Sequence, residues 1–394
     1  MIPRHPARSP RALCALAIFL AACGDDSPRR ASSGPAACEA RAEGSRWAST
    51  GAYRETASVG RGEADWLGEA GGVAVHDSLV FVYDPPEGRV RVLTEALAPV
   101  REFGGRGGGP GEMREHVSLG MHGPQWQWLA FTGDTLLVFD GVAVHRFSTD
   151  GRFLGRAYHR AAQRTDLNDG SAAIASRGGE LLSSWGGYYL SILRPPGDRY
   201  RWSILRHSAS GRPDTLLSLQ LAPLPSLAGG AGFNGPAQAR PLWGVSQACV
   251  VATDGGDGWI VRASLSGQGL DTLEFQLPDV APPPIDREEV GRLSGMVGKG
   301  RGGYLEPSRE QRISSLVVDP DGYAWVLPAQ DTAASPAGLE IVRVSLATGE
   351  AIQDTVPAFP LVFGRPGVFY ARNLNPITGE SEVVRYEAPA GEAR

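Results

Sequence analysis

The chain has 394 residues, with 38 Lys and Arg against 43 Asp and Glu. Residues 1–22 contain three arginines and no acid, so the chain without them carries 35 basic against 43 acidic groups. An acidic balance argues against a nucleic-acid partner, which requires a basic face. Lys299 is the only lysine, so arginine stands in for lysine throughout and its abundance does not indicate phosphate binding.

The first feature in chain order is a short apolar run, ALCALAIFLAAC, at residues 12–23. It follows three arginines and ends in small residues, which is typical of a secretory signal peptide. Eleven apolar residues precede Cys23, whereas a membrane-spanning helix needs about 20. We therefore predict that residues 1–22 are a processing signal and not an anchor helix.

The end of this run, Leu-Ala-Ala-Cys at residues 20–23, resembles the lipobox of bacterial lipoproteins. The resemblance implies that Cys23 becomes the acylated N-terminus and ties the protein to a membrane, because each buried CH₂ group contributes about 0.8 kcal/mol. Ordinary secretion with cleavage nearby is the alternative. Residues 23–45, rich in Ser, Pro, Gly and Ala, then form a flexible tether. Gly24 favours the outer membrane, with the protein facing the periplasm, if the enterobacterial sorting pattern applies.

Two cysteines remain once the signal peptide and Cys23 are set aside, namely Cys38 and Cys249. They could form a disulfide in an oxidising compartment. Because Cys38 lies in the predicted tether, the sequence leaves this pairing open.

The 52 glycines and 30 prolines predict many short strands and not long helices. Residues 71–113 contain four segments in which apolar residues alternate, with turn residues between them. Val80, Val82 and Asp84 share one face of the second segment. This pattern predicts one four-stranded antiparallel sheet.

The same pattern returns along the chain, which is the signature of a repeat architecture. Residues 126–157 repeat it, with Asp140 in the place of Asp84, and weaker copies occupy 180–221, 249–277, 314–356 and 360–388. The sixth copy has no outer strand of its own. Residues 47–60 have a strand-like pattern and can supply this strand, which closes the ring and removes exposed sheet edges.

We therefore predict an all-β fold, a six-bladed β-propeller of four-stranded antiparallel blades over residues 46–390. One stretch departs from strands. Asp286 is followed by Glu289 three residues later, as in a helix cap, and we predict a small helical insertion over about 283–312.

At the end of the first unit, residues 103–113 read FGGRGGGPGEM. This resembles the Phe-Gly-x-x-Gly-x-Gly-Pro-Gly-Glu-Phe signature of bacterial six-bladed, NHL-like propeller lipoproteins, with Met113 in place of the last Phe. The Asp-Gly rhythm at residues 136–151 and 318–326 adds to the likeness. The resemblance implies the fold far more than a function, because the family is mostly uncharacterised.

Several motifs favour structural roles. The glycines of 104–111 lack the Gly-Lys-Ser/Thr ending of a phosphate loop and favour a tight connection between blades. The Asp-Gly clusters at 254–258 and 319–322 lack the further ligands of a calcium loop and favour hairpin turns. The histidines show no metal-binding spacing, and no Gly-x-Ser-x-Gly is present. We therefore assign no catalytic residue and predict no cofactor.

The candidate ligand surface consists of Trp126, Trp128, Arg106 and Glu112. The two tryptophans share one face of a predicted strand and could stack on a sugar or peptide if that face opens to the central funnel.

These observations favour a non-catalytic, membrane-tethered module, a monomer that binds an envelope protein, peptide or glycan. The alternative is a metal-dependent hydrolase or lyase, because propellers of the gluconolactonase, strictosidine-synthase and streptogramin-lyase kinds are similar in architecture. They hold a divalent cation in the central channel with carboxylate, Asn or His ligands from several blades, which implies calcium or magnesium here. A third hypothesis, a purely structural envelope scaffold, predicts no polar pocket.

Overall fold

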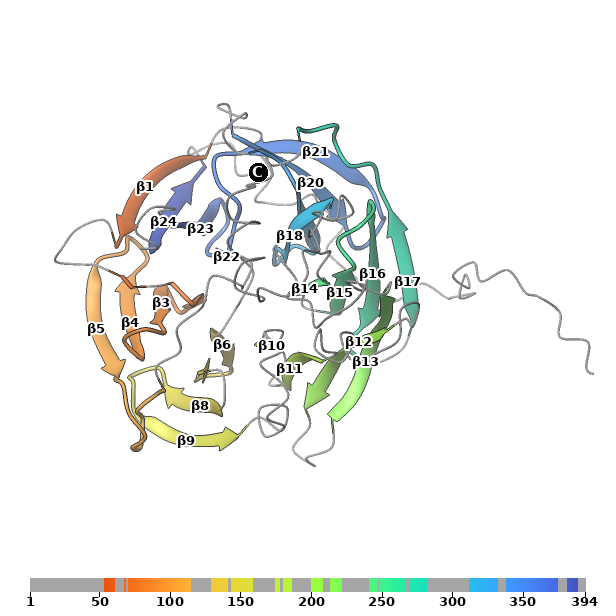
Figure 1. Ribbon diagram of the computed structural model, residues 1–394. Helices are drawn as coiled ribbons and strands as arrows, with labels where there is room; N and C mark the ends of the chain where they lie inside the picture. The colour runs from red at the N-terminus through yellow and green to blue at the C-terminus, as the bar shows by residue number, and fades with distance from the viewer. Residues whose placement is uncertain are drawn as a thin grey trace, which may run out of the picture. The chain divides into compact units, whose positions relative to one another are not determined.

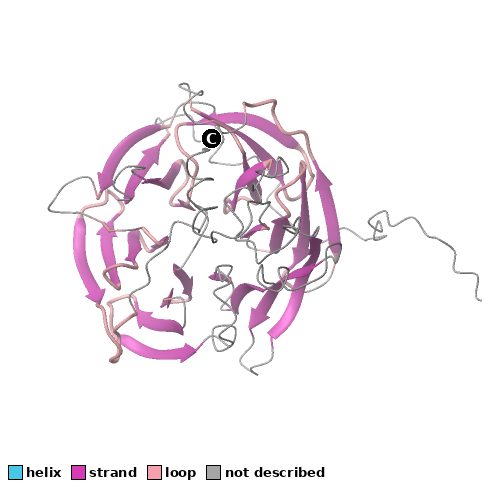
Figure 2. Ribbon diagram, in the orientation of Figure 1, coloured by secondary structure: helices cyan, strands magenta, loops and turns pink. Residues whose placement is uncertain are grey.

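The computed structural model describes residues 53–60, 67–68, 70–114, 129–140, 143–158, 174–177, 180–185, 200–207, 213–221, 241–246, 248–266, 269–281, 312–331, 338–374 and 381–388. They belong to one compact unit, Ser33–Arg394. These residues form six four-stranded antiparallel sheets, which lie around a ring (Figure 1). All regular structure in the described part of the chain is β-strand (Figure 2), and no helix there could span a membrane.

Blades 1 to 3 take their four strands in chain order, from the ring centre outwards. Blade 1 contains β2 (Gly72–His76), β3 (Leu79–Asp84), β4 (Arg89–Thr94) and β5 (Pro99–Gly104). Blade 2 contains β6 (Leu129–Thr132), β7 (Thr135–Phe139), β8 (Ala143–Ser148) and β9 (Phe153–Tyr158). Blade 3 contains β10 (Ile174–Arg177), β11 (Glu180–Trp185), β12 (Tyr200–His207) and β13 (Pro213–Leu221).

Blades 4 and 5 repeat this order, and blade 6 completes the ring. Blade 4 contains β14 (Leu242–Val245), β15 (Cys249–Thr253), β16 (Trp259–Ser264) and β17 (Leu270–Glu274). Blade 5 contains β18 (Ile313–Val318), β19 (Tyr323–Pro328), β20 (Leu339–Ser345) and β21 (Ala351–Val356). Blade 6 contains β22 (Val362–Phe363), β23 (Val368–Leu374), β24 (Ser381–Glu387) and, outermost, β1 (Arg54–Val59).

The predicted closure is confirmed. β1 pairs with β24 in antiparallel register from Arg54↔Glu387 to Val59↔Val383, so the first described strand completes the last blade. The six-bladed, all-β architecture is confirmed with it. The predicted helical insertion at 283–312 falls outside the described residues, apart from Arg312.

Apolar side chains fill the spaces between neighbouring blades. The residues that alternate along β3 and β7, among them Phe81, Leu136 and Val138, are fully buried and belong to one cluster between blades 1 and 2. Similar clusters join blades 4 and 5, and blades 6 and 1. A period of two places successive side chains on opposite faces of a sheet, so blade 1 packs against both of its neighbours, blades 2 and 6.

Polar contacts reinforce these seams at one recurring place. The turn between the third and fourth strands of a blade offers a backbone carbonyl, and a side chain of the preceding blade donates to it. The contacts are Arg101 to Thr149, Arg206 to Leu265 at 2.7 Å, Arg262 to Leu346 and Tyr370 to Glu95 at 3.0 Å. The same kind of side chain to carbonyl hydrogen bond therefore recurs at four seams between blades.

The antiparallel order gives the ring two distinct ends. One end of the ring carries the connections from the second to the third strand of each blade and from one blade to the next, and we call this end the loop face. The terminus face is the opposite end, with the hairpin turns between first and second and between third and fourth strands. β1 begins and β24 ends at the terminus face.

Cys249, at the start of β15, is fully buried and disulfide-bonded. Its partner, and with it the predicted pairing with Cys38, lies outside the described residues, as do Cys23 and residues 1–45 as a whole.

Candidate functional site

The two faces differ in the lengths of their connections. On the terminus face every hairpin turn has five residues or fewer. The connections between strand ends on the loop face reach from 275 to 312 after β17, from 105 to 128 after β5 and from 222 to 241 after β13. Long connections carry binding and catalytic residues far more often than tight turns do. The loop face is therefore the candidate functional face.

The glycine-rich connection after β5 is the best described part of this face. Gly105 N–H donates to Gly88 at 2.8 Å, Met113 N–H donates to Gly105 at 2.8 Å and Gly107 N–H donates to Met113 at 3.0 Å. Met113 is fully buried and lies against Gly104, where an added Cβ would come within 2.5 Å of its terminal methyl group. The glycine-rich residues 105–113 are tightly turned, because their backbone is held by its own hydrogen bonds, and the connection to blade 2 continues to residue 128.

Two predicted surface residues, Arg106 and Glu112, lie on this connection, and both have partners within the protein. Arg106 forms an exposed ion pair with Glu87 at 3.3 Å. The Glu112 carboxylate accepts a hydrogen bond from Gly109 N–H at 2.7 Å. Both side chains are exposed on the loop face, so the structure brings them to one surface. Trp126 and Trp128 lie outside the described residues.

Asp84 and Asp140, which the sequence repeat matches, perform the same task in successive blades. Asp84 accepts a hydrogen bond from Gly68 N–H at 3.1 Å, and Asp140 accepts one from Arg114 N–H at 3.3 Å. Each donor belongs to the connection that enters the blade of its aspartate. Both carboxylates are buried, and each ties an incoming connection to the end of the second strand.

Asp140 also pairs with a histidine, an arrangement that resembles part of a catalytic site. His145 Nε2 lies 2.8 Å from Asp140 Oδ2, and Asp140 Oδ1 accepts from Ala143 N–H at 2.7 Å. The histidine is 1% exposed, and its ring lies 6.4 Å from the rings of Phe147 and Phe153. A nucleophile or base must reach its substrate. This pair is shielded from solvent, so its role is structural: Asp140 binds the connection that enters blade 2.

The turn aspartates of blades 4 and 5 have structural roles. Asp319 accepts from Tyr323 N–H and from the Trp325 indole N–H, both at 2.9 Å, and Asp254 accepts from Gly256 N–H at 2.9 Å. Their oxygens thus serve hairpin turns, as the Asp-Gly pattern predicts. Within the described part of the chain no group of three or more His, Cys, Asp and Glu side chains is placed to hold a metal ion.

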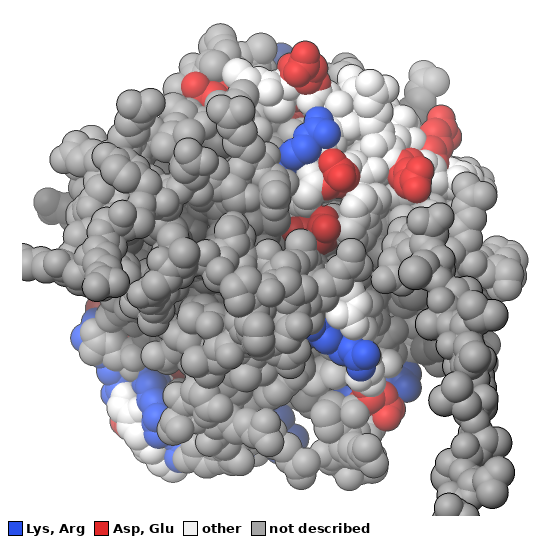
Figure 3. Space-filling model, turned by 45° about the vertical axis from the view of Figure 1, so that its right-hand side comes forward, with Lys and Arg blue, Asp and Glu red and all other residues white. Residues whose placement is uncertain are grey.

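Charges of both signs share the described surface. In Figure 3 acidic side chains predominate in the upper part of the view, whereas basic ones gather at the lower left. The acidic side chains there lie among uncharged surface.

Three strand arginines stabilise the blades in a way that the sequence analysis did not predict. Arg206, Arg262 and Arg343 each follow an apolar residue on the third strand of blades 3, 4 and 5. Each pairs with an aspartate on the fourth strand, at 3.4, 2.7 and 2.9 Å respectively. The signal was available, since an arginine inside an alternating apolar strand needs a polar or acidic partner.

No family model and no curated protein matches the chain. Among solved structures, it is similar to a protein of Bacteroides fragilis described as exported, at 12% identity and a TM-score of 0.48, over 86% of this chain and 96% of that one. It is similar to streptogramin B lyase at 10% identity and a TM-score of 0.41, over 85% and 97%. A calcium-binding regucalcin of Agrobacterium tumefaciens follows at 13% and 0.38, over 81% and 90%. Likeness at this level does not bear on activity, and the propeller assignment rests on the strand pairing above.

Proposed function

We propose that this chain is a membrane-tethered extracytoplasmic propeller that binds a protein, peptide or glycan of the bacterial cell envelope through its loop face and carries out no catalysis. The observation that carries the proposal is that the two faces differ in their connections. Long connections join strand ends on the loop face, while the chain enters and leaves the ring at the terminus face. A tether attached before β1 therefore leaves the loop face open.

The described contacts support binding over chemistry. The polar groups that would attract attention as catalysts are buried and engaged in holding connections, as Asp140 and His145 illustrate. Exposed groups on the loop face, such as Arg106 and Glu112, lie on a rigid glycine-rich backbone. A rigid scaffold lowers the entropy lost when a partner binds.

The proposed anchor is an acylated Cys23, with the protein in the outer membrane facing the periplasm. Expression of the full chain with radiolabelled palmitate tests this part. We expect the label in the wild-type protein and none in a Cys23→Ala variant. A wild-type chain that carries no label would overturn the anchor.

Site-specific photo-crosslinking in cells tests the binding face. A photoreactive residue replaces Arg106 on the loop face in one variant and Asp150 on the terminus face in another, both at exposed positions of blades 1 and 2. We expect a cross-linked species of defined mass from position 106 and none from 150. The same species from 150 alone would place the partner on the terminus face and refute the proposal. Chelator-sensitive turnover of an ester or lactone by the purified protein would favour the enzyme.

A further inference from the structure

The seam between blade 6 and blade 1 is made mainly by the inner strands of blade 6, and β1 contributes Val59 and the partly buried Ala57 to it. Arg372, on β23, donates to the Ala70 carbonyl at 3.0 Å, and Tyr370 donates to the Glu95 carbonyl at 3.0 Å. Buried Val368 and Val383 pack in the same cluster as residues of β2 and β3. Most of this seam does not involve β1, so we expect the ring to stay continuous when β1 is released.

The backbone of β1 pairs with β24 along the strand, whereas the buried side chains of the segment lie at its two ends. Tyr53, just before the strand, is 5% exposed, and Val59 at its end is 3% exposed. The Tyr53 ring meets Phe369 edge-on at 4.8 Å. Between these anchors Arg54, Glu55 and Thr56 are exposed or partly so, and a bulge between Glu55 and Ala57 interrupts the register. The segment thus resembles a peptide bound along a sheet edge by backbone pairing and pockets for a few side chains.

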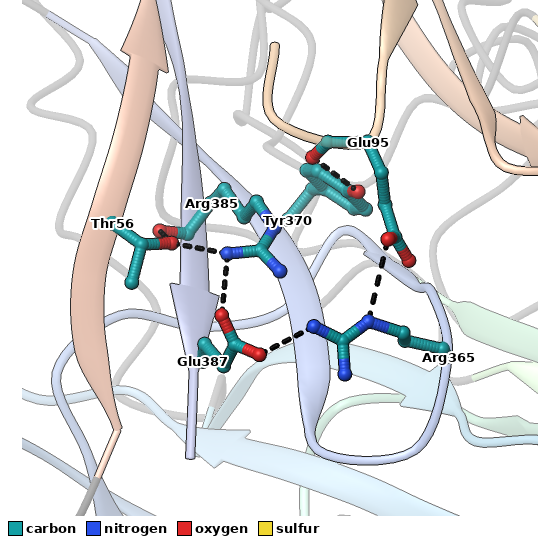
Figure 4. Close-up of polar contacts among 6 residues, drawn as sticks. All are labelled: Thr56, Glu95, Arg365, Tyr370, Arg385 and Glu387. Atoms are coloured by element: carbon teal, nitrogen blue, oxygen red, sulfur yellow. Dashed lines mark hydrogen bonds and ion pairs between the residues drawn. The ribbon is translucent and has the colours of Figure 1, made fainter. Parts of the chain in front are cut away.

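A chain of charged contacts fastens this segment at the terminus face (Figure 4). Arg385 donates to the Thr56 hydroxyl and, at 2.7 Å, to Glu387. Glu387 also accepts from Arg365, which in turn lies 3.3 Å from Glu95 of blade 1. The hydrogen bond from Arg385 lowers the pKa of Glu387, and Arg365 adds to this effect against the opposing effect of burial. Only Thr56 in this chain belongs to β1, so the other members remain together without it.

We propose that residues 53–59 are a releasable strap, and that the edge of β24 beneath it accepts the same segment from a second copy of this chain. The second copy is the occupant because it presents the same register, the same Tyr53 and Val59 anchors and the same Thr56. An uncovered strand edge presents unpaired backbone groups and pairs readily with another strand. Exchange of an identical element between copies needs no new interface.

Cysteine trapping between copies tests the proposal. Ser58 lies opposite Val384 in the β1 and β24 register. A full chain with Ser58→Cys is mixed with a full chain with Val384→Cys under mild oxidation. We expect a disulfide-linked dimer that retains the native circular dichroism spectrum. The matched control replaces Ser58→Cys by Thr272→Cys, an exposed position on the outer strand of blade 4, and should give no dimer. Equal dimer yields from both mixtures, or none from the first, would overturn the exchange.

A second measurement covers the case in which a cysteine variant misfolds. A protease site inserted between residues 63 and 64 of the full chain is cut after folding, and a labelled peptide of residues 50–60 is added. We expect its fluorescence anisotropy to rise to saturation at one peptide per chain. A peptide with Tyr53→Ala should bind about thirtyfold more weakly, because a buried aromatic anchor is lost. Unfolding on cleavage, or failure of the peptide to enter, would show that the strap is an inseparable part of the ring.

Discussion

Replacement of Asp140 by alanine is the sharpest test of how the loop face is held. Asp140 is 3% exposed and accepts hydrogen bonds from three donors. These are Ala143 N–H at 2.7 Å, Arg114 N–H at 3.3 Å and His145 Nε2 at 2.8 Å. The alanine variant removes all three acceptor contacts and leaves the donors in place.

The expected loss follows from the cost of buried donors without partners. A buried donor left unsatisfied costs about 1–3 kcal/mol, and two such donors remain, Ala143 N–H and the His145 ring. Arg114 N–H is only partly buried, so water can replace its contact at low cost. We therefore expect the Asp140→Ala variant to lose about 2–6 kcal/mol in the free energy of unfolding. Asn retains one acceptor for Ala143 N–H, so Asp140→Asn should lose less.

Urea unfolding followed by tryptophan fluorescence measures this difference. The matched control is Asp257→Asn, an exposed carboxylate 3.7 Å from Arg312, which should change the stability by less than about 0.5 kcal/mol. Hydrogen exchange should also speed up at Arg114 in the Asp140 variant. A loss below about 1 kcal/mol, the size of one exposed hydrogen bond, would refute the role given to this carboxylate.

Three further predictions concern the seams, the strap and the disulfide. Arg262→Met should lower the free energy of unfolding by about 2–3 kcal/mol, because it removes charged hydrogen bonds to Leu346 and to Asp271; urea titration measures the loss. Glu387→Gln should destabilise the protein at neutral pH, and the difference from the wild type should vanish on acidification. The pKa of Glu387 is lowered in the folded state, so its contribution is present above the unfolded value of 4.5 and is lost as the pH falls through the folded value. Non-reducing peptide mapping should find Cys249 linked to Cys38.

Each of these predictions has a distinct way to fail. The matched control for Arg262 is Arg206→Met, whose more exposed side chain should cost less, and equal losses would contradict the importance of burial. A Glu387→Gln difference that is constant between pH 3 and 7 would contradict a stabilising role for the Glu387 charge. Alkylation of Cys38 without prior reduction would contradict the proposed disulfide.

The alternating pattern and the turns sufficed to predict the fold, because both are local. Val80, Val82 and Asp84 on one face, followed by a turn and a second alternating segment, specify a hairpin without reference to the rest of the chain. Even the pairing of β1 with the last blade followed from counting strands, since one blade lacked its fourth. The placement of Arg106 and Glu112 on one surface could also be predicted, because both lie on the same short glycine-rich segment after β5.

What these side chains do was decided only by the tertiary structure. The repeat matched Asp84 to Asp140 but did not show that each holds an incoming connection, because the donors lie 16 and 26 residues away. The neighbouring blade supplies the carbonyl partners of Arg206 and Arg262, and no pattern within their own strands shows these contacts. Thr56 and Arg385 are 329 positions apart, and no local pattern reports on such a contact. Alternation and turns are fixed by neighbours in the chain, whereas seams, faces and the strap are fixed by neighbours in space.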